Sequence, residues 1–123
     1  MTDRPFEGRR ILLVEDEYLL ASDLAQELAG QGAQVLGPVP SVEKALALLA
    51  ANDRPDGAII DVNLGGELAF PVADALLSRG VPLVFTTGYD PGILPDRFEH
   101  VPRCEKPVRI DRVSRALGRL MAA

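Results

Sequence analysis

Five short, mostly apolar segments alternate with amphipathic segments along the chain. The apolar segments cover residues 10–14, 33–36, 57–61, 81–85 and 101–104. Continuous apolar runs of this length are typical of strands that are buried on both faces of a sheet. The intervening segments repeat apolar residues every three or four positions, which is the period of a helix with one buried face. This alternation predicts an α/β domain, with a parallel sheet that helices cover on both faces.

The helical segments have recognisable limits. Leu20, Leu24 and Leu28 define the first apolar helix face, and Ser41 is a predicted N-cap of the second helix. The third and last helices are expected over 69–79 and 110–121, residues 64–68 are expected to form a loop, and the prolines within 90–99 allow at most a short, broken helix there. With five strands and right-handed crossovers, the expected fold is flavodoxin-like and doubly wound, with strand order 2-1-3-4-5.

Length, charge and cysteine content narrow the class of protein. A chain of 123 residues fits one domain, for which we predict a flexible tail over 1–8 and a folded domain over 9–123. The net charge of −5 leaves no basic stripe and argues against nucleic-acid binding. A single cysteine, Cys104, excludes an internal disulfide and fits a reducing compartment. Neither a membrane span nor a signal peptide is apparent, so we expect a cytoplasmic protein.

Polar residues follow four of the five predicted strands at the point where each strand ends. Glu15 and Asp16 follow the first strand, Asp61 ends the third, Thr87 follows the fourth and Lys106 follows the fifth. The carboxyl ends of parallel strands meet at one edge of the sheet, where such folds bind ligands. We therefore expect these five side chains to converge.

Three converging carboxylates repel one another and favour a bound cation. At about 4 Å, each pair costs roughly 1 kcal/mol in water and about 4 kcal/mol at an effective dielectric constant of 20. Oxygen ligands without histidine or cysteine favour Mg²⁺. A lysine and a threonine hydroxyl would complete a phosphoryl-binding site, in which Asp61 is the nucleophile that forms an acyl phosphate.

With this set of motifs, the chain resembles the receiver domain of two-component response regulators over nearly all of residues 9–122. The resemblance implies that Asp61 accepts a phosphoryl group from a phosphohistidine of a partner kinase. It also implies that Thr87 and Lys106 hold that group. The implied Mg²⁺ ligands are Asp16 and Asp61 directly, the backbone carbonyl of Asn63, and Glu15 mostly through water.

The segment Phe85-Thr86-Thr87-Gly88-Tyr89 is similar to the "FAT GUY" subgroup of receivers, with Thr86 in place of the alanine. Regulators of that subgroup often work with HWE or related histidine kinases. Two departures from the general receiver pattern stand out. Gly65-Gly66-Glu67 replaces the usual proline and glycine, and Arg103 occupies the position of the aromatic switch residue. We therefore predict Thr87 and Tyr89 as the switch residues.

Several functions remain open on these residues. The last predicted helix ends close to Ala123, so we expect a single-domain regulator that signals through contacts with a downstream protein. Such a chain catalyses its own phosphorylation and slow dephosphorylation, and is a switch rather than an enzyme. The alternatives are a phosphate sink, a phosphorylation-independent interaction module, and an aspartyl-nucleophile phosphatase. The phosphatase motif requires an aspartate where this chain has Asn63.

Overall fold

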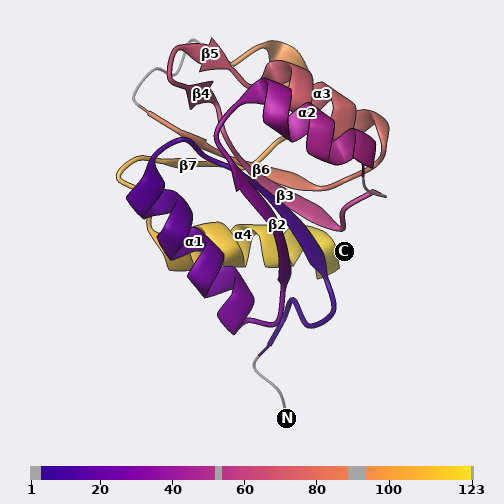
Figure 1. Cartoon of the computed structure of the whole chain (residues 1–123), viewed down its shortest axis with the longest axis vertical. Coiled ribbons are helices and arrows are strands. Elements are labelled where there is room, and N and C mark those ends of the chain that lie inside the picture. Colours follow the sequence, from indigo (N-terminus) through magenta and orange to yellow (C-terminus); the bar gives the residue numbers. More distant parts are fainter. Residues whose placement is uncertain (1–3, 52–53, 89–93, 123) are drawn as a thin grey trace.

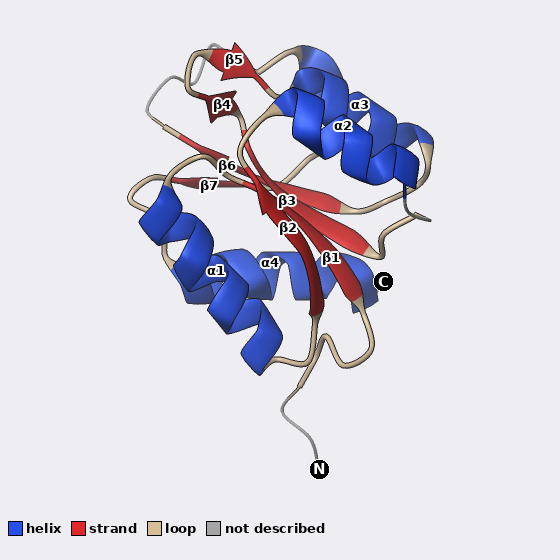
Figure 2. Ribbon diagram, viewed as in Figure 1, coloured by secondary structure: helices blue, strands red, loops and turns tan. Residues whose placement is uncertain are grey.

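The central layer of the protein is a five-stranded parallel sheet. The computed structural model describes residues 4–51, 54–88 and 94–122. The strands lie in the order β2-β1-β3-β6-β7, as Figure 2 shows. Their bounds are Gln34–Val39 (β2), Arg10–Val14 (β1), Gly57–Asp61 (β3), Leu83–Thr87 (β6) and Arg103–Glu105 (β7). Because β6 and β7 are the fourth and fifth strands of this sheet along the chain, the predicted order 2-1-3-4-5 is confirmed.

Helices cover both faces of the sheet. On one face lie α1 (Tyr18–Gly30) and α4 (Ile110–Ala122), and on the other lie α2 (Val42–Ala51) and α3 (Phe70–Ser78) (Figure 1). Each pair of helices closes its own apolar core against the sheet. The described residues include no helix long and apolar enough to cross a membrane.

Strand β3 lies at the centre of the sheet, and all five of its residues are buried. Successive side chains of a strand point to opposite faces. Ala58 and Ile60 accordingly belong to the core under α2 and α3, and Ile59 belongs to the core under α1 and α4. Asp61 follows as the first polar residue of this run. A strand that contributes to two cores therefore delivers one carboxylate to the edge of the sheet.

The segment that follows β3 is a small hairpin, where the sequence led us to expect a loop. Strands β4 (Asn63–Leu64) and β5 (Glu67–Leu68) pair antiparallel. Gly65 and Gly66 form the turn, with φ angles of 64° and 100°. Two successive positive φ angles are typical of the tight turns that match the twist of a hairpin. The glycine pair was visible in the sequence, but the strands are too short to show a period of two.

The first described residues are packed on the domain. Phe6 is fully buried in the core formed with α1 and α4, and its N–H donates to the carbonyl of Gln31 at 3.0 Å. The predicted flexible tail over residues 1–8 stays a prediction, although Phe6 within it packs on the domain through an aromatic side chain. The boundary at residue 8 stays a prediction.

Between β6 and β7 the described part of the chain contains a single 3₁₀ turn, η1 (Asp96–Phe98). Phe98 is fully buried and lies edge-on to Phe85, with ring centroids 5.5 Å apart. This matches the expected short, broken helix for residues 96–98. The remainder of that expectation falls on residues 89–93, which lie outside the described residues.

Candidate functional site

Three carboxylates meet where β1 and β3 end. Glu15, Asp16 and Asp61 each place one oxygen atom within 4.8 Å of the other two. Glu15 and Asp61 are buried, with 3% and 1% of their surface exposed, whereas Asp16 is exposed at the rim of the cluster. The predicted convergence of these carboxylates is therefore present in the structure.

Lys106 lies beside the buried carboxylates of Glu15 and Asp61. Its Nζ lies 2.7 Å from Oδ2 of Asp61, 3.7 Å from Oε2 of Glu15 and 3.9 Å from Oε2 of Glu17. Its backbone N–H donates to the carbonyl of Thr87 at 2.7 Å, which ties the lysine to the end of β6. One ammonium group thus forms ion pairs with three acidic side chains.

The two oxygens of Asp61 have different partners. Oδ2 accepts from Lys106, and Oδ1 accepts from the backbone N–H of Asn63 at 3.1 Å. The side chain of Asn63 is itself used in the hairpin, where its Oδ1 accepts from the N–H of Gly66 at 2.7 Å. Asp61 is thus held as an oriented carboxylate, and its orientation depends on the β4–β5 hairpin.

The surroundings of Glu15 strongly raise the pKa of its carboxyl group. Burial, followed by the hydrogen bond and charge of Asp61, raises the pKa of its carboxyl from 4.5 to about 8. The N–H of Glu17, which donates to Oε2 at 3.1 Å, and the charge of Lys106 act in the opposite direction. Proximity to other acids and loss of water both disfavour a second negative charge here.

The cluster fits a hard divalent cation. Oε1 of Glu15 is buried without a hydrogen-bond partner among the described residues. The available donors are carboxylate oxygens, and no histidine or cysteine belongs to the cluster. An orphaned buried oxygen beside two further carboxylates is the donor set that Mg²⁺ prefers. On this observation, the residues present fit the metal that the sequence suggested.

The pKa of Lys106 is raised above 10.5, so the side chain stays charged. Burial lowers this pKa, but the hydrogen bond to Asp61 and the charges of Asp61, Glu15 and Glu17 outweigh it. A cation that stays charged in a half-buried site is suited to hold the oxygens of a phosphoryl group.

The remaining predicted residues occupy different positions around the site. Thr87 ends β6 and is 7% exposed, next to the lysine that its carbonyl holds. Asn63 lies in β4 and contacts the site through its backbone. Tyr89 lies outside the described residues. Arg103 pairs with Phe85 across β6 and β7, and its side chain is exposed rather than placed in a core.

Two residues beside the site did not emerge from the sequence. Glu17 contacts Lys106, an ion pair that the sequence does not predict. Thr86 is fully buried, lies opposite Asp61 in the register, and its hydroxyl has no hydrogen-bond partner among the described residues. The alternation of strand faces could have placed Thr86 beside Asp61, but the contact of Glu17 depends on the path of the chain into α1.

Comparisons with known proteins agree with this fold. No family model matches the sequence. The chain is 33% identical over 90 residues to the phyllosphere-induced regulator PhyR of Methylorubrum extorquens, an alignment of 72% of this chain and 32% of the relative. The chain thus spans about a third of the length of that relative.

Solved structures cover the chain more completely. The solution structure of SdrG from Sphingomonas melonis Fr1 is 41% identical with a TM-score of 0.75, over 88% of this chain and 92% of that one. Its BeF3-activated conformation is 39% identical with a TM-score of 0.73, over 98% and 99%. A response regulator receiver protein from Sinorhizobium medicae is 25% identical with a TM-score of 0.79, over 94% and 95%. The match to SdrG covers nearly all of both chains, and the fold is shared with solved receiver proteins. The chain therefore belongs to the response regulator receiver domain family.

Proposed function

We propose that this receiver domain accepts a phosphoryl group on Asp61 and changes its protein contacts in response. The observation that carries the proposal is the 2.7 Å contact between Lys106 Nζ and the buried Asp61 carboxylate, within a cluster of three acids. A lysine that only stabilises the fold needs one acidic partner. Two further carboxylates at the same place lower the stability of the folded state unless they bind a ligand.

The proposed reaction moves one phosphoryl group between two side chains. An oxygen of Asp61 attacks the phosphorus of a phosphohistidine on a partner kinase, and the bond from phosphorus to the imidazole nitrogen breaks. The electron pair of that bond leaves with the imidazole, and an acyl phosphate forms on Asp61. Lys106 would hold one of the phosphoryl oxygens by charge, and the hydroxyl of Thr87 would donate to another.

Glu15, Asp16 and Asp61, with the backbone carbonyl of Asn63, would hold Mg²⁺ in the proposed site. When bound, the ion supplies positive charge that offsets the negative charge of the incoming phosphoryl oxygens. The described residues contribute the rest. Lys106 donates to one oxygen of Asp61 and the N–H of Asn63 donates to the other, and these two bonds would orient the carboxylate for attack.

Assignment to the FAT GUY subgroup, and action as a single-domain regulator, stay part of this proposal. We propose a sensor histidine kinase of the HWE or a related type as the phosphodonor, and a downstream protein as the receiver of the signal. The BeF3-activated conformation of SdrG supports a phosphoryl-triggered change, because beryllium fluoride imitates a phosphoryl group bound to a carboxylate. We extend that behaviour to this chain by similarity. Tyr89 with Thr87 stays our proposed switch pair.

The test is uptake of phosphate from a small phosphodonor with Mg²⁺. The wild-type chain is expected to gain the mass of one phosphoryl group, whereas Asp61→Asn keeps the shape of the side chain, removes the nucleophile and gains none. Asp23→Asn is a matched control, because Asp23 is an exposed aspartate on α1, away from the carboxylate cluster. Equal uptake by wild type and Asp61→Asn would refute the assignment.

A further inference from the structure

A second concave site lies at the opposite end of the sheet from Asp61. The cavity measures about 530 Å³ and lies at the amino ends of β3 and β6, beside the last turn of α4. Its floor is apolar, with Val81 and Leu83 fully buried and Leu120 and Met121 half-buried. Pockets that hold small ligands have about this volume.

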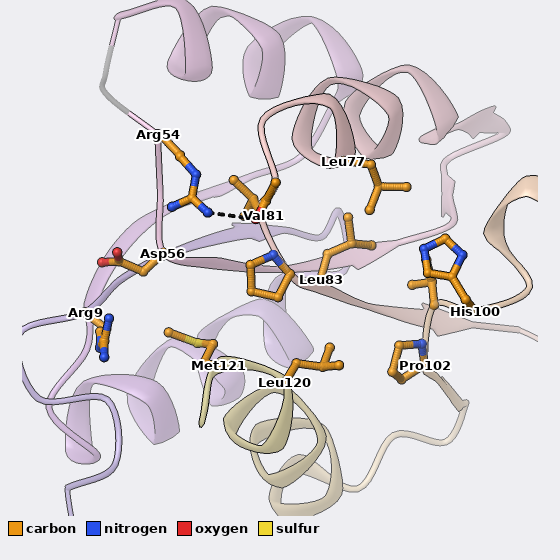
Figure 3. Close-up of a pocket in the computed structure, with 13 residues that line it drawn as sticks. Arg9, Arg54, Asp56, Leu77, Val81, Leu83, His100, Pro102, Leu120 and Met121 are labelled. Carbon is orange, nitrogen blue, oxygen red and sulfur yellow. Dashed lines mark hydrogen bonds between the residues drawn. The ribbon is translucent and has the colours of Figure 1, made fainter. Parts of the chain in front are cut away.

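Three basic side chains surround this apolar floor. Figure 3 shows Arg9 and Arg54 at one end of the cavity and His100 at the other, with Leu83 and Leu120 between them. The positive charge of the lining comes from the two arginines at one end, in a chain whose net charge is −5. The arrangement suits a ligand with an apolar body and a negative group.

The guanidinium of Arg54 is oriented, yet its charge is not balanced by an acid among the described residues. Its Nε donates to the carbonyl of Arg79 at 2.7 Å, and its Nη2 donates to the carbonyl of Gly80 at 2.7 Å. Both partners are neutral. A guanidinium has five N–H donors, so three remain after these two bonds. Two hydrogen bonds thus orient Arg54 beside the cavity, and its other N–H groups can donate to a ligand.

The acidic residue in the cavity lining, Asp56, accepts a hydrogen bond from the backbone. Oδ2 of Asp56 accepts from the backbone N–H of Arg10 at 2.8 Å, which ties the start of β1 to the start of β3. The ion pairs found among the described residues include neither Arg9 nor Arg54. The bond from a neutral N–H leaves the negative charge of Asp56 in place, so the two arginines exceed it by one positive charge at this end of the cavity.

From this arrangement we propose that the cavity binds a small amphipathic carboxylate. The apolar body of the ligand lies against Val81, Leu83 and Leu120, and its carboxylate meets Arg9 and the free donors of Arg54. An arginine pairs with a carboxylate through two parallel hydrogen bonds, and burial of the apolar body supplies the remaining affinity. The proposal is independent of phosphorylation, because none of these residues belongs to the carboxylate cluster at Asp61.

The test is a titration of the isotope-labelled full chain with octanoate, followed by NMR. Saturable shifts are expected at the amides of Gly80, Leu83 and Met121, and much weaker effects from octanol, which lacks the charge, and from acetate, which lacks the apolar body. Arg9→Gln should weaken octanoate binding about tenfold, the usual size of a lost charged hydrogen bond. Arg112→Gln, an exposed arginine of α4 outside the cavity, should leave the affinity unchanged.

Any of three results would overturn the proposal. These are shifts that do not saturate, octanol binding as tightly as octanoate, and equal effects of Arg9→Gln and Arg112→Gln. Phosphate uptake measured on the same variants should equal that of wild type, since neither arginine contacts Asp61. A failure of the cavity proposal and a failure of the phosphorylation proposal are therefore separate results.

Discussion

Glu15 shows how one buried side chain links the candidate metal site to stability. Its carboxyl is buried, its pKa is raised to about 8, and one of its oxygens has no partner among the described residues. In the metal-free protein, the folded state therefore binds the proton of Glu15 more tightly than the unfolded chain does. The proposed cation site is thus a source of instability in the metal-free protein.

We predict that the metal-free protein loses stability through Glu15 as the pH rises from about 4.5 to about 8. In that window the unfolded chain releases a proton that the folded chain retains, so the free energy of unfolding falls with rising pH. The loss should be on the order of 2–4 kcal/mol at full deprotonation. It can be measured by urea unfolding in EDTA across this pH range.

Glu15→Gln should abolish this slope, because the amide keeps the shape of the side chain and does not titrate. Glu43→Gln is the matched control, since Glu43 is exposed in the first turn of α2, away from the cluster. The control should keep the slope of the wild type. A wild-type curve that is flat between pH 4.5 and 8 would contradict the assignment of Glu15.

Residue by residue, the sequence identified the groups that end strands and missed those that depend on the path of the chain. Asp61 was predictable because an apolar run stops at one carboxylate. Glu17 was not, because its contact with Lys106 depends on how the chain enters α1. The switch role of Tyr89 stays a prediction.

At the scale of elements, the hairpin after β3 positions the site. Its first residue, Asn63, donates to Asp61 through its backbone and accepts from Gly66 through its side chain. The turn therefore helps to orient Asp61, together with Lys106. A change that disturbs the turn should weaken the fold and loosen the carboxylate together.

We predict that Gly66→Ala lowers the free energy of unfolding by on the order of 1–2 kcal/mol, because φ at this position is 100° and an L side chain is strained there. A Cβ at Gly66 would meet no atom within 4 Å, so the backbone angle alone is tested. Chemical denaturation of the two proteins gives the difference.

Gly30→Ala is the matched control for the hairpin glycine. Gly30 ends α1, its φ is not positive, and a Cβ there would also meet open space. Alanine at such a position should stabilise the protein by about 0.5 kcal/mol, because it restricts the unfolded chain. Opposite signs for the two substitutions are expected, and a stabilising Gly66→Ala would show that the turn is not under this constraint.

Element limits were predictable wherever a local signal marked them. Ser41 was identified as a cap, and the N–H of Lys44 donates to its hydroxyl at 3.2 Å. The sequence predicts a loop in place of the hairpin, because a strand of two residues is too short to show the alternation of apolar and polar side chains. Packing of Phe6 against the domain was also missed, since one aromatic residue in a polar segment gives no repeating pattern.

For the whole molecule, the two ends of the sheet carry different features. Strands β3 and β6 begin beside the cavity lined by Val81 and Leu83, and they end beside Asp61 and Thr87. The Asp61 end was predictable because the carboxyl ends of parallel strands must meet at one edge. The cavity was not, because its lining combines β6, α4 and connecting segments that only the tertiary fold brings together.

The candidate metal site should make the stability of the whole domain depend on Mg²⁺. A ligand that binds only the folded state raises the free energy of unfolding by about 1.4 kcal/mol at tenfold its dissociation constant. We predict this rise for the wild type in thermal or urea unfolding, and its reversal by EDTA. Asp16→Asn removes the exposed carboxylate of the cluster and should require a much higher Mg²⁺ concentration for the same rise.

Asp23→Asn provides the matched comparison, because it removes the same charge from an exposed position of α1 outside the cluster. The change in net charge is identical in the two variants, so general attraction of Mg²⁺ to an acidic protein would weaken both equally. A specific site should distinguish them, with Asp23→Asn following the wild-type curve. If both variants shift together, or if Mg²⁺ does not stabilise the wild type, Glu15, Asp16 and Asp61 do not form a metal site.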